Sequence, residues 1–347
     1  MFSHETYMQR CVQLAQKGLG LVSPNPMVGC VVVYQNEIIG EGFHQKYGEA
    51  HAEVNAIQAV KDKSLLKDAT VYVSLEPCNH YGKTPPCADL LVKHQVKRVV
   101  VGCKDPFSMV NGTGIQKLKD AGIEVVEDVL KEVCMDLNKR FFTYHLKKRP
   151  YIILKWAESA DGFLYNKQHA AISGIMAQTL NHQWRSEEDA YLIGKNTLMT
   201  DNPQLNTRLV AGKDPIRIVL DSQLVSLQKG TFHFYNQKQT TMVINLLKNE
   251  IDGAIQCIKI NDTQNLQEVL DALYQQHMQS VVVEGGAALL NSFINANLMD
   301  EIRIFKSHAL VLGNGIKAPV ISKQDFEVVR LDKDDYLKQS FYNIIYT

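Results

Sequence analysis

Short hydrophobic runs recur along the whole chain, and segments with helical spacing separate many of them. The runs are continuous rather than alternating with polar residues, which is typical of strands covered on both faces of a sheet. They predict strands at residues 28–34, 70–75, 98–102, 123–127, 151–155, 190–193, 216–220, 242–245, 280–283 and 301–305.

Between these runs, apolar residues gather on one face of expected helices. Tyr7, Cys11, Leu14 and Ala15 share a face in the first such segment. Two further helical patterns are carried by residues 90–92 and by Val269, Leu270, Leu273 and Met278. The alternation of strands and helices predicts an α/β fold.

The 347 residues are enough for two domains at about 150 residues each. The most pronounced seam is the basic stretch 146–150, which follows a helical segment, ends in Pro150 and precedes a new strand. We therefore expect one domain over residues 1–147 and a second over residues 150–347. The apolar fraction of 45% is ordinary for globular domains of this size.

Charge and cysteine content narrow the possible functions. The 37 basic and 37 acidic residues cancel, whereas nucleic-acid binding usually requires a basic excess. No apolar run is long enough to span a membrane, and the polar N-terminus lacks a signal-peptide pattern. Seven scattered cysteines do not form a disulfide framework. We expect a cytoplasmic protein without nucleic-acid or membrane partners.

Three motifs in the first half predict a zinc site. His51 opens a helical run, Cys78 follows a strand in Glu-Pro-Cys, and Cys87 follows two prolines and opens another helix. One imidazole and two thiolates suit zinc and leave a fourth position for water. At a helix start, the positive end of the dipole also favours the thiolate form of Cys87.

Glu53 gives this zinc site a predicted chemistry. Successive helical positions are about 100° apart, so His51 and Glu53 converge only if the helix begins at about His51. A carboxylate beside zinc-bound water can take its proton and pass it to a leaving nitrogen, as in zinc deaminases. A purely structural zinc is the alternative. It would recruit a fourth ligand, for which His80 is the candidate, and it would leave Glu53 unexplained.

These motifs resemble one family closely. Residues 25–29, 48–54 and 75–87, with eight residues between Cys78 and Cys87, are similar to the bacterial bifunctional riboflavin-biosynthesis deaminase/reductase (RibD) family. The resemblance implies a cytidine-deaminase-like α/β/α zinc domain in which Asn25 lines the pyrimidine pocket and Lys83 faces the phosphoribosyl end. Asn79 replaces the usual serine, and residues 105–108 depart from the usual Asp-Pro-Asn-Pro.

The second half is less specific when its residues are considered alone. Residues 281–289 predict a strand, a Gly-Gly turn and a helix, and such a turn can present N–H groups to a phosphate. An ordinary β–α turn explains the same pattern. Arg185 and Arg208 could bind phosphate or be solvated surface residues. No G-x-G-x-x-G motif supports a Rossmann dinucleotide site.

The resemblance extends over this half and implies a dihydrofolate-reductase-like α/β domain that uses NADPH. The matching segments are residues 157–162, the block from Arg185 to Arg208, residues 221–222 and residues 284–286. The resemblance implies cofactor contacts at Ala157, Ala171, Thr197, Asp201, Ser222, Gly286 and Ala287. It implies substrate contacts at His169, Arg185, Leu205, Arg208 and Glu284.

One segment departs from the family pattern. Residues 166–173 are about two residues shorter than usual, with Ala171 at the position of a tryptophan and His169 near that of a serine. Loss of the aromatic ring would remove a stacking surface, so reductase efficiency and cofactor placement are the properties that we expect to differ here.

The resemblance implies two successive reactions on one phosphorylated pyrimidine. Zinc-dependent deamination of 2,5-diamino-6-(5-phosphoribosylamino)pyrimidin-4(3H)-one is followed by NADPH-dependent reduction of the ribosyl group. We expect one zinc ion per chain and a homo-oligomer, either a dimer or a tetramer. Two alternatives remain: a nucleic-acid or nucleoside base deaminase with an accessory domain, and a zinc-stabilised binding module without catalysis.

Overall fold

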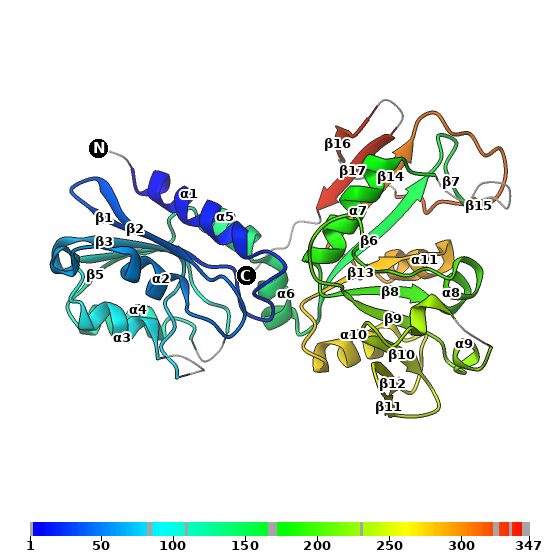
Figure 1. Cartoon of the computed structure of the whole chain (residues 1–347), viewed down its shortest axis with the longest axis horizontal. Helices are drawn as coiled ribbons and strands as arrows, with labels where there is room; N and C mark the ends of the chain where they lie inside the picture. The colour runs from blue at the N-terminus through cyan, green and yellow to red at the C-terminus, as the bar shows by residue number, and fades with distance from the viewer. Residues whose placement is uncertain are drawn as a thin grey trace. The chain divides into compact units, whose positions relative to one another are not determined.

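The chain divides between Lys147 and Lys148 into two units, Met1–Lys147 and Lys148–Thr347. The computed structural model, drawn in Figure 1, describes residues 3–81, 85–107, 110–165, 172–229, 232–321, 326–332 and 335–341. The division falls inside the basic stretch 146–150. Among the described residues, no helix has the length and apolar character needed to cross a membrane.

The first unit is built on a five-stranded sheet in the order β2-β1-β3-β4-β5. β1 pairs antiparallel with β2 and β3, whereas β3, β4 and β5 run parallel. The strands are β1 (Gly29–Tyr34), β2 (Glu37–Phe43), β3 (Thr70–Leu75), β4 (Arg98–Cys103) and β5 (Glu124–Val126).

Helices cover both faces of this sheet, so the unit has α/β/α layers (Figure 1). α1 (His4–Ala15) and α5 (Lys131–Leu137) lie on one face, and α2 (Ala52–Ala59), α3 (Cys87–Lys93) and α4 (Thr113–Asp120) on the other. The remaining helices are η1 (Gln16–Gly18), η2 (Lys63–Asp68) and α6 (Lys139–Lys147). The face predicted for the first helix is confirmed, because Tyr7, Cys11, Leu14 and Ala15 are all buried.

Strand β2 was not predicted, because it is rich in charge and glycine and lacks an apolar run. Its glycines allow close helix packing. A Cβ atom on Gly42 would lie 2.3 Å from the backbone nitrogen of Ala56 and 2.6 Å from the carbonyl oxygen of Ala52. The backbone of β2 therefore supports α2 directly, and α2 begins at the first metal-site motif.

The second unit contains a ten-stranded sheet in the order β11-β12-β10-β9-β8-β13-β6-β14-β17-β16. Strands from β12 to β14 in this order are parallel, and the outer strands β11, β17 and β16 are antiparallel to their neighbours. The strands are β6 (Tyr151–Glu158), β8 (Ala190–Gly194), β9 (Ile216–Leu220), β10 (Thr241–Asn245), β11 (Glu250–Asp252), β12 (Ile255–Lys259), β13 (Ser280–Glu284), β14 (Glu301–Ser307), β16 (Glu327–Arg330) and β17 (Asp335–Phe341), while β7 (Phe163–Tyr165) and β15 (Ile316–Lys317) pair separately.

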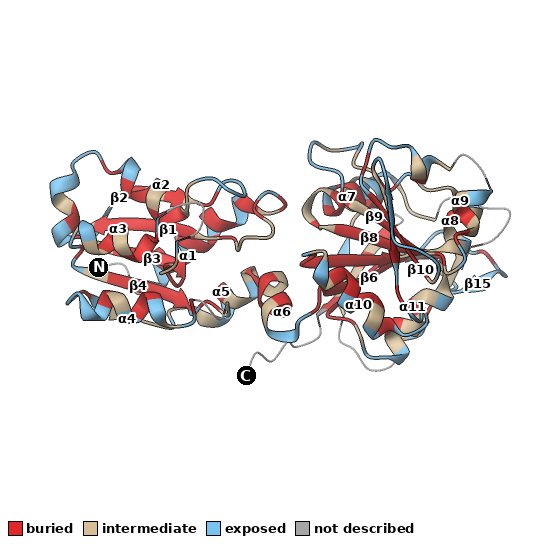
Figure 2. Ribbon diagram, turned by 90° about the horizontal axis from the view of Figure 1, so that it is seen from below, coloured by how far each residue is buried: buried red, intermediate tan, exposed pale blue. Residues whose placement is uncertain are grey.

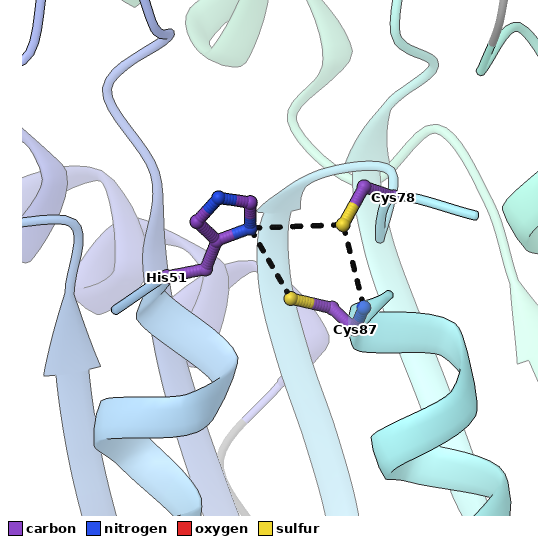
Figure 3. Close-up of side chains that lie close together, drawn as sticks. All are labelled: His51, Cys78 and Cys87. Atoms are coloured by element: carbon purple, nitrogen blue, oxygen red, sulfur yellow. Dashed lines mark hydrogen bonds between the residues drawn. The ribbon is translucent and has the colours of Figure 1, made fainter. Parts of the chain in front are cut away.

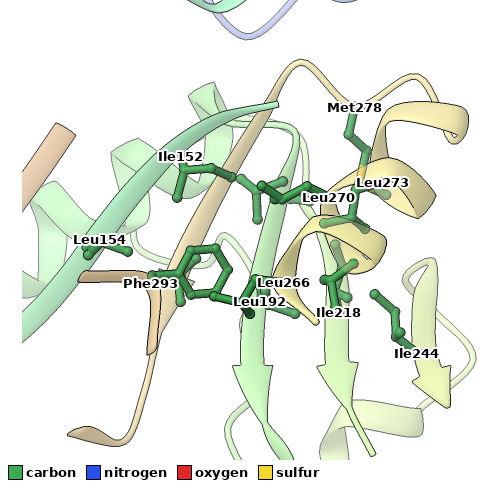
Figure 4. Close-up of a cluster of buried hydrophobic side chains, with 14 of the residues drawn as sticks. Ile152, Leu154, Leu192, Ile218, Ile244, Leu266, Leu270, Leu273, Met278 and Phe293 are labelled. Carbon is green, nitrogen blue, oxygen red and sulfur yellow. The ribbon is translucent and has the colours of Figure 1, made fainter. Parts of the chain in front are cut away.

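Apolar clusters cover both faces of this sheet. On one face, side chains of α10 (Leu266–Gln275) and α11 (Ala287–Asn295) pack on the parallel strands, as Figure 4 shows for Leu270, Leu273 and Phe293. The other face is covered by α7 (Ile175–Glu187), α8 (Lys195–Asp201), α9 (Val225–Gln228) and η3 (His233–Tyr235). Figure 2 shows the central strands in the red of buried residues.

The predicted α/β fold is confirmed, and all ten predicted strands are present. The missed strands in the second unit are short or carry polar residues. β12, β16 and β17 lie toward the ends of the sheet, where a strand has fewer neighbours and needs no continuous apolar run. The five cysteines assigned to packing, Cys11, Cys30, Cys103, Cys134 and Cys257, are all free and buried, which confirms that prediction.

Candidate functional sites

His51 stands at the start of α2. It is the N-cap residue, with extended backbone angles of φ −73° and ψ 166°, and the helix itself begins at Ala52. The prediction that the helix starts at about His51 is confirmed. Because the backbone changes direction here, Glu53 lies in the first turn and is 3% exposed.

The two cysteines come from a strand end and a helix start. Cys78 follows β3, and Cys87 is the first residue of α3, directly after Pro86 at the N-cap. The backbone N–H of Cys87 donates to Sγ of Cys78 across 3.3 Å. The loop between them therefore brings its two ends together.

These three side chains meet at one point (Figure 3). Nδ1 of His51 lies 3.3 Å from Sγ of Cys87 and 3.6 Å from Sγ of Cys78. Their possible ligand atoms all lie within 4.8 Å of one another. One imidazole nitrogen and two sulfurs at this spacing fit tetrahedral zinc with one open position.

His80 does not belong to this group. Among the described residues, the side chains that could hold a metal ion together are those of His51, Cys78 and Cys87, called here the metal-binding group. The His80 ring instead contacts Phe107, with 5.9 Å between ring centroids. Three protein ligands with a carboxylate nearby are typical of a catalytic rather than a structural zinc site.

The ligands share protons when no metal neutralises them. The pKa of Cys78 is lowered to about 4, first by a hydrogen bond from the Cys87 side chain and further by His51. The pKa of Cys87 is raised, first by its side-chain hydrogen bond with Cys78 and then by burial. A hydrogen bond with Cys78 raises the pKa of His51. Zinc binding must therefore release protons from this group.

Glu53 has the protonation behaviour of a proton carrier. Burial raises its pKa to about 7, and the nearby His51 opposes part of that rise. A carboxyl group whose pKa lies near neutral pH can both accept and return a proton. Its position beside the three ligands is the arrangement that the sequence predicted.

Glu76 holds the loop that carries Cys78. The Glu76 side chain is 3% exposed. Its carboxylate accepts hydrogen bonds from the backbone N–H groups of Asp105, Gly112, Gly114 and Ile115. Gly114 permits this packing, because a Cβ atom there would lie 1.9 Å from the carbonyl oxygen of Pro77. The Glu-Pro-Cys motif contains Glu76 but does not reveal its partners, although a carboxylate directly after a buried strand signals that it has one.

Asn25 is linked to the metal-binding group through His44, a histidine that no sequence motif marks. Nδ1 of His44 lies 3.1 Å from the carbonyl oxygen of Ala50, so this nitrogen must carry the proton. Nε2 of His44 then accepts from the Asn25 side chain at 3.1 Å. The His44 ring contacts the edge of His51, with centroids 5.3 Å apart.

Three of the expected site residues cannot be placed. Lys83, His169 and Ala171 lie outside the described residues.

In the second unit, Glu284 stands at the end of β13 between two cations. Its Oε1 lies 2.7 Å from Nζ of Lys155, and its Oε2 lies 3.7 Å from Nη2 of Arg185. Burial by itself would raise the pKa of Glu284, but the charges of Lys155 and Arg185 outweigh it and lower the pKa. Lys155 was read only as part of a strand. A lysine inside an apolar run was the signal, since buried lysines need a partner.

Arg185 and Arg208 approach one backbone segment. Nη1 of Arg185 donates to the carbonyl oxygen of Asn206 at 3.3 Å, and Nη1 of Arg208 donates to the Asn206 side chain at 3.0 Å. Arg185 is 7% exposed, whereas Arg208 is exposed. The structure thus brings together Arg185, Arg208 and Glu284, which the sequence analysis grouped as substrate residues.

Leu205, which precedes Asn206 in the chain, differs from the arginines because its side chain packs in the core. Its side chain is 3% exposed and packs in the core with Tyr191 and Val219, and its backbone has φ of 46°. Its carbonyl oxygen accepts from the Gln239 side chain at 3.0 Å. The side chain is therefore committed to packing, and any contact with a substrate would come from the backbone.

The expected cofactor residues follow the carboxyl ends of neighbouring parallel strands, where ligands bind in open α/β sheets. Thr197 follows β8 and accepts a hydrogen bond from the backbone N–H of Gly286, which follows β13, at 3.0 Å. Ser222 follows β9 and bonds Thr263 at 2.6 Å. The others are Ala157 near the end of β6, Asp201 at the end of α8, and Ala287 at the start of α11.

Two family models match the chain. Residues 1–103 match the cytidine and deoxycytidylate deaminase zinc-binding region. Residues 150–339 match the RibD C-terminal domain. The first match contains the metal-binding group, and the second contains the cluster around Glu284.

Full-length relatives are similar over most of the chain. The riboflavin biosynthesis protein RibD of Actinobacillus pleuropneumoniae is 39% identical over 326 residues, covering 90% of this chain and 86% of the relative. RibD of Aquifex aeolicus is 38% identical over 321 residues, covering 90% of this chain and 88% of the relative.

A solved structure is similar across both units. It is a diaminohydroxyphosphoribosylaminopyrimidine deaminase/5-amino-6-(5-phosphoribosylamino)uracil reductase from Thermotoga maritima, with a TM-score of 0.86 and 35% identity, covering 97% of this chain and 98% of that one. The chain therefore belongs to the RibD family of bifunctional riboflavin-biosynthesis enzymes, which combine a zinc-binding deaminase domain with a reductase domain.

Proposed function

We propose that residues 1–147 deaminate 2,5-diamino-6-(5-phosphoribosylamino)pyrimidin-4(3H)-one and that residues 150–347 then reduce its ribosyl group with NADPH. The observation that carries the proposal is the meeting of His51, Cys78 and Cys87 within 4.8 Å beside buried Glu53. The product would be 5-amino-6-(5-phosphoribitylamino)uracil. The similarity to the Thermotoga maritima enzyme supports the choice of substrate.

In the deaminase half, His51, Cys78 and Cys87 would hold one zinc ion, which would supply Lewis-acid activation of a water molecule. Glu53 takes the proton of the attacking water and delivers it to the departing ammonia. Asn25, ordered by its bond to His44, faces the pyrimidine ring. Lys83 binds the phosphoribosyl end.

In the reductase half, NADPH would supply the hydride, and the protein positions the reacting carbon. The cofactor is held by Ala157, Ala171, Thr197, Asp201, Ser222, Gly286 and Ala287. Arg185 and Arg208 bind the substrate phosphate, because guanidinium groups match phosphate oxygens. Glu284, held by Lys155, binds ribose hydroxyls or the amine, and His169 and the backbone of Leu205 complete the substrate site.

A coupled assay tests this function. The diaminopyrimidine phosphate is supplied first without NADPH, and released ammonia is quantified. NADPH is then added and its absorbance followed. Reduction that occurs only after ammonia release is the expected result. Metal-loaded protein that releases no ammonia and oxidises no NADPH would instead identify a zinc-stabilised binding module.

Three finer properties belong to the same proposal. Metal analysis should find one zinc ion per chain, since one group of candidate ligands is present among the described residues. NADPH should be used in preference to NADH in parallel kinetic assays. We also propose a homo-oligomer, a dimer or a tetramer, in the cytoplasm, which light scattering and cell fractionation would check. The free state of the cysteines supports a reducing compartment.

A further inference from the structure

His182 lies beside the two arginines of the reductase half, although no motif singled it out. It belongs to α7 and precedes Arg185 by one helical turn, so both side chains project from the same face. The His182 side chain is 3% exposed. A buried histidine between two arginines requires an explanation of its hydrogen bonds.

The hydrogen bonds of His182 fix its tautomer. The backbone N–H of Arg208 donates to Nδ1 of His182 across 3.1 Å, so Nδ1 carries no proton. Burial first, and then the charges of Arg185 and Arg208, lower the pKa of His182 to about 4. The ring is therefore neutral at pH 7, and its single proton is on Nε2.

The ring of His182 can donate to the backbone of Asn206, an interaction that raises its pKa, but the carbonyl oxygen of Asn206 also accepts from Nη1 of Arg185 at 3.3 Å. Nε2 lies 3.4 Å from Nη1 of Arg185, and a guanidinium group cannot accept a hydrogen bond. Nε of Arg185 is also buried without a hydrogen-bond partner among the described residues. The donors of His182 and Arg185 thus share one carbonyl oxygen, and Nε of Arg185 has no acceptor among the described residues. An anion supplies the acceptors that this cluster lacks.

We infer that His182 binds the phosphate of the reductase substrate, donating a hydrogen bond from Nε2 as an uncharged third donor beside Arg185 and Arg208. The inference rests on the proposed function, which places the substrate phosphate at these arginines. It adds a phosphate-binding residue, and it explains why the backbone of Arg208 bonds to the ring: that bond directs the proton of His182 toward the phosphate.

Two matched variants separate the two nitrogens of the ring. His182→Asn keeps an oxygen near the Nδ1 position, which can still accept from Arg208, but removes the outer donor. His182→Gln keeps an amide N–H near the Nε2 position and removes the inner acceptor. The deaminated substrate, 5-amino-6-(5-phosphoribosylamino)uracil, is reduced with NADPH by each full-length variant. Ammonia release by the other half of the same chain is the internal control.

The expected result is a rise of about ten- to hundredfold in the KM for this substrate in His182→Asn, as for a lost hydrogen bond to a charged group. His182→Gln should retain a KM closer to that of the wild type. The preference for the phosphorylated over the dephosphorylated substrate should fall in His182→Asn, and the KM for NADPH should change little.

Two results would overturn the inference. One is an unchanged KM and unchanged phosphate preference in His182→Asn. The other is an equal loss for both forms of the substrate in both variants, which would indicate a purely structural role. Binding of inorganic phosphate to wild type and to His182→Asn, measured by calorimetry, tests the phosphate contact separately, and weaker binding by the variant is expected. If wild type oxidises no NADPH with this substrate, the proposed function fails, and weaker phosphate binding by the variant still supports the role of His182.

Discussion

At the residue scale, single positions decide which groups carry protons. Glu53 is a buried carboxyl group and Glu284 a partly buried one, and their surroundings act in opposite directions. Burial dominates at Glu53 and raises its pKa to about 7, whereas Lys155 and Arg185 lower the pKa of Glu284. Glu53 is therefore suited to transfer protons, and Glu284 to remain an ionised partner for substrate groups.

Replacing Glu53 by Gln should abolish ammonia release and leave zinc bound. The glutamine keeps the size of the side chain but cannot transfer the proton, and general acid–base groups contribute about 10²- to 10⁴-fold to rate. Ammonia release and metal content would be measured on the same sample. Reduction of the deaminated substrate is the control, because it uses the other half of the chain. Retained turnover in Glu53→Gln would refute the role.

The low pKa of His182 predicts how stability depends on pH. The pKa is about 4 in the folded chain against an ordinary 6.5, so the unfolded chain binds protons first as pH falls. Burial first, and then the charges of Arg185 and Arg208, lower this pKa, while Glu284 and the backbone of Asn206 oppose them. The stability contributed by the neutral ring is present above pH 6.5 and is lost as pH falls toward 4.

Denaturant unfolding of wild type and His182→Asn at several pH values measures this contribution. The difference between their free energies of unfolding should favour wild type more at pH 7 than near pH 4. A difference that stays constant across this range would show that His182 titrates normally.

At the element scale, the metal-binding group depends on where secondary structure begins and ends. His51 caps α2, Cys87 opens α3, and Cys78 follows β3. Sequence patterns predict these boundaries well, because prolines and the ends of apolar runs mark them. They do not show that Glu76 binds four backbone N–H groups around Cys78, since these come from residues 29 to 39 positions away.

Replacing Glu76 by Ala should reduce both zinc retention and ammonia release. Four N–H groups, three of them buried, would lose their acceptor, and each buried unsatisfied group costs about 1–3 kcal/mol. Zinc would be titrated against a chelator in Glu76→Ala and in Glu124→Ala, a control at an exposed position of β5. Unchanged zinc affinity in Glu76→Ala would exclude a role of Glu76 in positioning Cys78, even if the free energy of unfolding fell.

At the scale of the whole molecule, each of the two units contains one candidate site. The metal-binding group lies within Met1–Lys147, and the cluster around Glu284 lies within Lys148–Thr347. Zero net charge is compatible with the anionic substrate of the proposed function, because the cations that it requires are local. Arg185 and Arg208 meet at one segment and need no basic surface elsewhere.

Removing zinc should therefore affect the two activities differently. Zinc binds folded protein and stabilises it by mass action. A chelator should abolish ammonia release and lower the unfolding temperature of the unit that contains His51. NADPH oxidation with the deaminated substrate should continue. Calorimetry and the two assays on one preparation check this, and an equal loss of both activities would contradict it.

The sequence by itself determined the α/β class and ten strands, and it singled out Glu53 and the three candidate metal ligands that the fold brings together, because these features are local runs, boundaries and motifs. The tertiary structure alone decided the pairing of Lys155 with Glu284, the anchoring of Cys78 by Glu76 and the tautomer of His182. Each of these depends on groups brought together from different elements. Spacing along a chain predicts secondary structure and ligand motifs, but burial and hydrogen-bond partners, which set protonation, exist only once the chain has folded.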